Sequence, residues 1–264
     1  MATSPTKGVF DPLYQEGVRL FNAGELPAAA KVFSSAFNVA ENDQQYADAT
    51  HQLALVLTKQ RELRQAKKEF EWADWYAERA DNDAQRYRIK RDLAWLEMVR
   101  LQRNPLYFLI SIFPASKHGF GPLDRAEILL QNSLNGLNHL KEKQEALITR
   151  AYFGRLDVLR RDYHGAFATL HYAYETLLKQ SPININWTYR LNLLMWLIRA
   201  APKPERADWQ EVIEALIQKT GQTSRLVELK VILKFGDTGY RIVQWFPEWL
   251  QKIGYKLVKP LLGK

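Results

Sequence analysis

The amino-acid sequence predicts an all-α fold built from repeated pairs of helices, and three observations carry this prediction. No stretch alternates apolar and polar residues with the sustained period of two that strands require. Apolar residues instead recur at helical spacing, and a pattern of small and large residues returns after 37 residues. The 264 residues are 47% hydrophobic and 25% charged. This composition supports a substantial buried core and excludes a disordered chain.

The repeat places small residues where two helices would cross and a large apolar residue beside them. Its first copy covers residues 13 to 36 and its second covers residues 50 to 73. A third copy covers residues 154 to 173, and a fourth is split by an insertion. The aligned positions are Gly17, Leu20, Gly24, Ala29, Phe33 and Ala36; Ala54, Leu57, Arg61, Ala66, Phe70 and Ala73; Gly154, Asp157, Arg161, Ala166, Leu170 and Ala173; and Ala94, Ala126, Leu130 and Ser133.

These residues resemble the tetratricopeptide repeat, over about residues 10 to 178. The resemblance implies a right-handed helical-repeat solenoid of about ten to twelve helices, in which the first helix of each pair lines a concave face. The usual opening aromatic residue and closing proline are missing. Each copy takes 37 to 40 residues in place of the family's 34, so the chain is interpreted as a divergent version.

Two regions follow from this pattern. Residues 1-178 are predicted to hold four divergent helical pairs, with an apolar insertion at 104-122. Residues 179-264 are predicted to continue the array as a fifth pair and a basic amphipathic C-terminal cap. Within this second region, apolar spacing predicts helices near 187 to 198, 209 to 217, 225 to 235 and 240 to 258, with a turn at 236 to 239.

The formal charge of +8 is concentrated at the C-terminal end of the chain. Residues 219 to 264 contain nine Lys or Arg and three acids, a net charge of +6. Such an excess favours anionic partners. The first residues lack the apolar stretch of a secretory signal, and no apolar run reaches the roughly 20 residues that span a bilayer. We therefore expect a cytoplasmic protein, with a location peripheral to a membrane as the alternative.

Catalytic and metal-binding patterns are not found in the sequence. With no Cys, disulfides, thiolate metal sites and cysteine nucleophiles are excluded. The five histidines are scattered, since the two nearest, His164 and His171, stand seven residues apart, about 10 Å along a helix. No glycine-rich phosphate loop is followed by Lys-Ser or Lys-Thr. The sequence therefore predicts that the chain is not an enzyme and that it has no metal site and no cofactor.

The resemblance implies a partner-binding groove that is aromatic and basic. Arginine offers paired donors to carboxylates or phosphates, and aromatic rings supply large rigid contacts. The alternative is that these side chains merely cover the helix stack. The groove positions are Tyr14, Phe21, His51, Arg88, Arg91, Trp95, Tyr152 and Arg155.

Two further segments are candidate contact surfaces. Tyr107, Phe108 and Phe113 in the insertion would form an interaction patch if exposed, or core if the segment folds back. The last helix places apolar residues opposite lysines, a pattern typical both of a membrane-surface helix and of a terminal cap. Its candidate membrane contacts are Trp245, Trp249, Lys252 and Lys256.

The sequence therefore predicts a non-enzymatic protein-interaction module that binds a peptide or helix of a partner protein on its concave face. The expected partner is acidic or amphipathic. RNA or other nucleic acid binding through the basic aromatic groove is one alternative, with arginines on phosphates and rings stacked on bases. A membrane-surface adaptor acting through the C-terminal helix is the other. The sequence assigns no oligomeric state.

Overall fold

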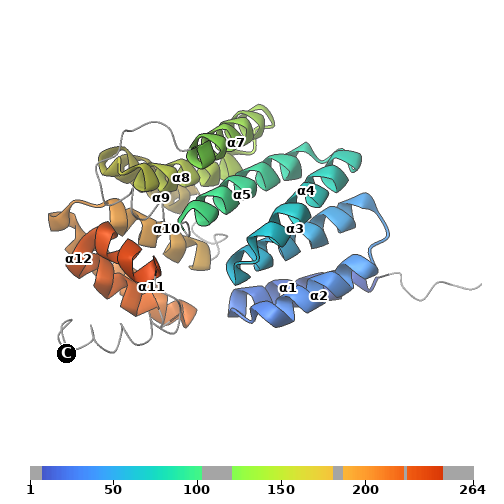
Figure 1. Ribbon diagram of the computed structural model, residues 1–264, viewed down its shortest axis with the longest axis horizontal. Coiled ribbons are helices and arrows are strands. Elements are labelled where there is room, and N and C mark those ends of the chain that lie inside the picture. The colour runs from blue at the N-terminus through green and yellow to red at the C-terminus, as the bar shows by residue number, and fades with distance from the viewer. Residues whose placement is uncertain (1–7, 103–120, 181–186, 223–224, 246–264) are drawn as a thin grey trace, which may run out of the picture. The chain divides into compact units, whose positions relative to one another are not determined.

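The computed structural model describes residues 8–102, 121–180, 187–222 and 225–245, and within these ranges it confirms the predicted all-α fold (Figure 1). Eleven α-helices and one short 3-10 helix make up the described part, which contains no strand. The elements are α1 (Phe10–Ala23), α2 (Leu26–Asn38), α3 (Asp43–Gln60), α4 (Leu63–Arg79), α5 (Asp83–Gln102), α7 (Gly121–His139), α8 (Lys143–Arg160), α9 (Tyr163–Gln180), α10 (Trp187–Ala200), η1 (Lys203–Glu205), α11 (Arg206–Thr220) and α12 (Arg225–Trp245).

The chain divides into two compact units, residues 1–99 with 125–146 and residues 100–124 with 147–264. The first unit contains α1 to α4 and most of α5 and α7. The second contains most of α8 and all of α9 to α12. The sequence-based division at residue 178 stays a prediction.

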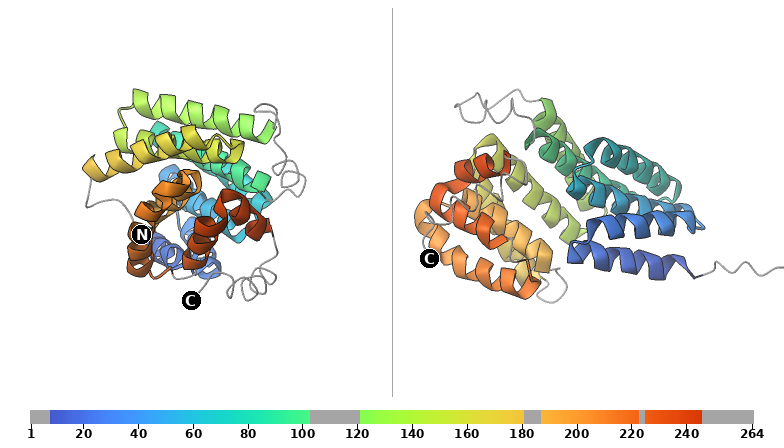
Figure 2. Two further views of the ribbon diagram at one scale, coloured as in Figure 1. Left: turned by 90° about the vertical axis from the view of Figure 1, so that its left-hand side faces the viewer. Right: turned by 60° about the horizontal axis from the view of Figure 1, so that its bottom comes forward.

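In the first unit, successive helices pack side by side in chain order, α1 on α2, α2 on α3 and α3 on α4 (Figures 1 and 2). The turn inside each pair needs a left-handed residue, and the aligned repeat positions provide it. Gly24 has φ of 82° and Arg61 has φ of 75°, and the third copy's Arg161, in the second unit, has φ of 65°. Each ends the first helix of its pair, where a left-handed residue lets the chain reverse. The sequence alignment therefore located the turns.

The predicted small residues do lie at helix contacts. A Cβ added to Gly17 would come within 2.6 Å of the Phe33 ring, and one added to Gly154 within 2.5 Å of Leu170 Cγ. Gly136 of α7 is a close contact that the alignment did not include. A Cβ added to it would likewise collide with the Tyr87 ring of α5. The aligned alanines have no exposed surface, and they are Ala29, Ala36, Ala54, Ala66, Ala73, Ala94, Ala126, Ala166 and Ala173.

Replacing Ala66 with leucine is expected to overpack the contact between α3 and α4. Inserting extra carbon atoms into a closely packed contact costs about 1–3 kcal/mol. The expected result is a lower midpoint of thermal unfolding than in the wild-type protein, measured by circular dichroism. Ala23→Leu, at an exposed position of α1, is the matched control and should leave the midpoint nearly unchanged. An unchanged midpoint in Ala66→Leu would contradict the repeat register.

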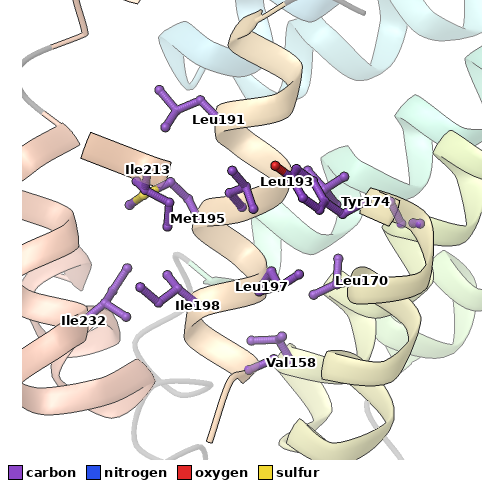
Figure 3. Packing of buried hydrophobic residues seen from close by; sticks show 14 of the residues in the cluster. Val158, Leu170, Tyr174, Leu191, Leu193, Met195, Leu197, Ile198, Ile213 and Ile232 are labelled. Atoms are coloured by element: carbon purple, nitrogen blue, oxygen red, sulfur yellow. The ribbon is translucent and has the colours of Figure 1, made fainter. Parts of the chain in front are cut away.

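The core of the second unit is centred on α10, which packs against α9, α11 and α12. Figure 3 shows Leu193 and Leu197 directed toward α9, while Met195 and Ile198 lie toward Ile213 of α11 and Ile232 of α12. Because α10 is buried on several sides, its apolar residues do not form a single stripe. They include Leu191, Leu193, Leu194, Met195, Leu197 and Ile198. The predicted pair near 187 to 198 and 209 to 217 is confirmed as α10 and α11.

The end of the described chain follows the sequence-based expectation of two helical segments. The two segments of α12 meet at Gly236, whose φ of 67° and ψ of −165° are not helical. The predicted break after residue 235 is therefore confirmed, although it is shorter than the predicted turn at 236 to 239. The last stretch of the predicted cap, after residue 245, lies outside the described residues. In the described part of the chain, no helix combines the length and the apolar character needed to cross a membrane.

Candidate partner-binding surfaces

The predicted groove residues are distributed over both units. Tyr14, Phe21, His51, Arg88, Arg91 and Trp95 belong to the first unit, and Tyr152 and Arg155 belong to the second. The geometry of each set is therefore described within its own unit.

Tyr14 and Phe21 lie on α1 and differ in their surroundings. The Tyr14 ring stacks on Phe10 with centroids 5.7 Å apart and meets the edge of Phe33 at 5.9 Å. Burial, with the nearby charge of Asp48, raises the pKa of Tyr14 to about 12. Phe21 is half-buried, and the Lys59 ammonium lies 3.8 Å from its ring centroid. Tyr14 thus packs within the unit, whereas Phe21 belongs to a cation–aromatic pair on its surface.

His51 and Arg91 are buried, and both contact the carboxylate of Asp92. His51 Nε2 lies 2.9 Å from Asp92 Oδ2, and Arg91 Nε donates to Asp92 Oδ1 at 3.1 Å. Arg91 Nη1 also donates to Glu145 Oε2 at 2.6 Å. Burial alone would raise the pKa of Asp92, but the Arg91 charge and the His51 hydrogen bond outweigh it and lower that pKa to about 2. Asp92 is thus ionised, so His51 Nε2 carries the donated hydrogen.

Arg88 and Trp95 retain more exposed surface. Arg88 Nε lies 3.4 Å from Glu145 Oε1, and its Nη2 lies 4.0 Å from Glu142 Oε2. Its side chain is 37% exposed. Trp95 is half-buried. In this unit the predicted groove arginines are therefore paired with acids of the same unit, which reduces the positive charge that they offer to a ligand.

In the second unit, Tyr152 and Arg155 belong to a series of alternating rings and guanidinium groups. The Arg155 Cζ lies 4.4 Å from the Tyr152 ring centroid and 5.8 Å from that of Trp196. The Arg199 Cζ lies 3.8 Å from the same Trp196 centroid and 4.5 Å from that of Tyr240. Contacts between cations and ring faces recur along α8, α10 and α12.

Asp237 pairs with one of these two arginines. Arg199 Nε donates to Asp237 Oδ1 at 2.6 Å, and Tyr163 Oη donates to Asp237 Oδ2 at 3.0 Å. Both charged side chains are almost fully buried, at 4% and 3% exposure. Burial also raises the pKa of Tyr240 beside them. Trp196, Arg199 and Asp237 were missed at the sequence level. Trp196 and Arg199 are neighbours on α10, but their contacts with Arg155 and with Asp237 join residues far apart in the chain.

The most exposed aromatic surface was also missed, and it lies on α4. We call it the α4 aromatic surface, defined by Trp72, Trp75 and Tyr76. Trp72 is 54% exposed and Trp75 is 41% exposed, and their ring centroids lie 5.7 Å apart. The Tyr76 ring lies 4.9 Å from Trp75 and 5.1 Å from Tyr46 of α3.

The sequence contained a signal for this surface. The buried stripe of α4 is formed by Ala66, Phe70, Ala73 and Ala77. Trp72 and Trp75 fall outside that stripe on a helix of 3.6 residues per turn. The resemblance directed attention to the first helix of each pair, and α4 is a second helix.

The remaining candidate residues fall at or beyond the edge of the described part. Tyr107, Phe108, Phe113, Trp249, Lys252 and Lys256 lie outside the described residues. Trp245 is the last residue of α12. The interaction patch of the insertion and the C-terminal membrane contact stay predictions.

Comparison with known proteins adds little to this geometry. No family model matches the chain, and no curated protein matches it. Among solved structures, the chain is similar to the crystal structure of BtubC (BKLC) from P. vanneervenii, at 12% identity and a TM-score of 0.49. This similarity covers 85% of the chain and 92% of BtubC. A likeness at this level carries no argument about function.

The prediction that the chain is not an enzyme is corrected at this point. It rested only on the lack of recognised catalytic motifs in the sequence, and that lack does not exclude catalysis. The prediction is therefore withdrawn.

Proposed function

We propose that this chain is a protein-interaction module, a divergent tetratricopeptide-like array that binds an amphipathic helix or peptide of a partner protein. The observation that supports the proposal is the α4 aromatic surface, with its two neighbouring, exposed indole rings. Exposed large aromatic side chains are costly to leave in water and are enriched among the residues that dominate binding energy.

The aromatic surface is held rigidly, which favours binding. The opposite stripe of α4 is fully buried, so the helix cannot rotate to hide the indoles. The Tyr76 ring packs against the rings of Tyr46 of α3 and Phe37 of α2, and its centroid lies 5.1 Å and 6.2 Å from theirs. A surface ordered before binding loses less conformational entropy when a partner docks.

The charges around this surface favour an amphipathic protein segment over nucleic acid. Arg79 lies over the Trp75 ring, at 4.6 Å from its centroid, and its Nε donates to Asp43 at 3.1 Å. Lys67 lies 3.6 Å from Glu71. Because these cations are paired with acids, an apolar face with a charged edge suits the surface better than a row of phosphates does.

The predicted concave face remains a second contact region within this proposal. Its residues that are partly exposed in the first unit are Tyr14, Phe21, Arg88 and Trp95. The membrane-adaptor alternative concerns residues 245 to 256 and is tested separately by binding to anionic vesicles.

The test is affinity capture from the source cell with wild-type protein and two matched variants. We expect Trp72→Ala/Trp75→Ala to lose its partner by about tenfold or more, since hot-spot aromatics dominate affinity. The control is Tyr172→Ala, which removes a side chain that is 53% exposed on α9, and it should retain the partner. Both variants should unfold near the wild-type midpoint, because exposed side chains contribute little to stability.

Full retention of the partner by the double tryptophan variant excludes the α4 aromatic surface. A third variant, Trp95→Ala, then tests the predicted concave face, and loss of the partner in that variant would assign binding to this face. Material that is released by RNase and by moderate salt would support the nucleic-acid alternative. A partner held equally by all variants would exclude both surfaces.

A further inference from the structure

Arg155 of α8 is a buried cation that no acid of the described chain neutralises. Its residue exposure is 6%, and its Nε is fully buried without a hydrogen-bond partner. Within the described residues its contacts are the ring faces of Tyr152 and Trp196. Two other buried arginines show the ordinary arrangement, since Arg91 pairs with Asp92 and Glu145 and Arg199 pairs with Asp237.

An unpaired guanidinium in this position carries its charge permanently. Arginine does not deprotonate in proteins, so burial cannot be relieved by losing a proton. Ring faces attract the cation, but they do not accept the five N–H donors as an oxyanion does. A buried charge of this kind is costly unless a counter-ion binds it.

The carboxylate of Asp237, which pairs with Arg199 beside the Trp196 ring, already has two hydrogen-bond donors. Asp237 accepts hydrogen bonds from Arg199 at 2.6 Å and from Tyr163 at 3.0 Å. Within the described residues, Arg199 is paired with Asp237, whereas Arg155 has no acidic partner. One monovalent oxyanion would balance the charge of Arg155.

We propose that Arg155 binds a single carboxylate group of an acidic ligand, with the rings of Tyr152 and Trp196 beside the bound group. Nε is the guanidinium nitrogen that is buried without a partner, so the Nη end is the side from which the ligand approaches. A planar carboxylate pairs with two guanidinium N–H groups at once and lies flat beside the aromatic rings. The site belongs to the second unit and does not depend on the α4 aromatic surface.

The test follows the Arg155 Nε–H resonance by NMR, assigned by its loss in Arg155→Met. The probes are sodium acetate and a short blocked peptide with one glutamate, each compared with sodium chloride at equal ionic strength. A peptide with glutamine in place of glutamate is the uncharged control. Saturable shifts with acetate and with the glutamate peptide are expected, whereas the glutamine peptide and chloride should produce none. Binding by the peptide alone would assign the carboxylate to a protein ligand, and equal binding of acetate would assign it to a small acid.

Matched variants separate binding from a packing role. Arg155→Met keeps the aliphatic stem and removes the charge. Because this variant has no Arg155 Nε–H, probe binding to it and to the wild type is compared through the indole N–H resonance of Trp196, and its affinity for the probe should fall by at least about tenfold. Without a ligand this variant should be as stable as the wild type or more stable, because it removes an unpaired buried charge. Arg150→Met, on an exposed arginine of the same helix, should bind as the wild type does.

Unchanged binding in Arg155→Met would overturn the proposal, as would shifts that chloride reproduces. Stronger binding of inorganic phosphate than of acetate would overturn the choice of a carboxylate. If Arg155→Met fails to fold, Arg155→Lys keeps the charge but not the paired donors, and carboxylate binding that is unchanged in this variant would equally overturn the proposal.

Discussion

Replacing Asp237 with alanine is expected to lower the free energy of unfolding by about 3–5 kcal/mol. The substitution leaves Arg199 buried without the carboxylate that lies 2.6 Å from its Nε. It also removes the acceptor of the Tyr163 hydroxyl. Most of the cost comes from the uncompensated buried charge, because the pair itself pays a desolvation penalty that offsets its attraction. Denaturant unfolding followed by circular dichroism measures the change.

Two further variants separate this cause from a general effect of removing an acid. Asp208→Ala, at an exposed position of α11, should change the free energy of unfolding by less than about 0.5 kcal/mol. The double variant Arg199→Met/Asp237→Leu should recover much of the loss, since it removes both charges together. A single Asp237→Ala variant as stable as the wild type would show that Arg199 does not depend on this carboxylate.

Replacing Asp92 with alanine is expected to destabilise the first unit by about 3 kcal/mol. Arg91 keeps its contact with Glu145, so the loss should be smaller than for Asp237. His51 loses its acceptor, and Arg91 loses one of its two carboxylates. Denaturant unfolding measures the change, and Asp74→Ala is the control, because Asp74 pairs with Arg86 at a half-exposed site. If the two substitutions lowered the free energy of unfolding equally, Asp92 would contribute no more than an ordinary half-exposed acid.

The same carboxylate predicts a defined response to acid. The pKa of Asp92 is lowered from 3.8 to about 2 in the folded protein, so its stabilising contribution is present above pH 4 and is lost as the pH falls toward 2. The linked contribution at neutral pH is about 2 kcal/mol. Stability measured between pH 5 and pH 2 should therefore fall less steeply in Asp92→Ala than in the wild type.

The positions of the helices and of their close contacts could be predicted from the sequence, because both depend on local periodicity and on side-chain volume. Gly17 and Gly154 are small where Phe33 and Leu170 approach them, and Arg61 and Arg161 end helices where the alignment matched them to Gly24. The predicted break after residue 235 is present as the non-helical Gly236 between the two segments of α12.

The candidate sites were less predictable, because charge pairing and exposure depend on residues that are distant in the chain. His51 meets Asp92 across 41 positions, and Arg91 meets Glu145 across 54. No local pattern shows that these partners neutralise the predicted groove, or that Arg155 lacks such a partner.

An all-α helical repeat could be predicted from the sequence, since the spacing of apolar and small residues fixes which faces of neighbouring helices can pack. Which polar and aromatic side chains remain available to a ligand depends instead on contacts between distant helices. Trp72 and Trp75 stay exposed because the other stripe of α4 fills the core. Arg155 has no acidic partner among the described residues, whereas Arg199 is paired with Asp237. Exposure and charge balance are set by the packing of whole helices against one another, and a single helix does not encode them.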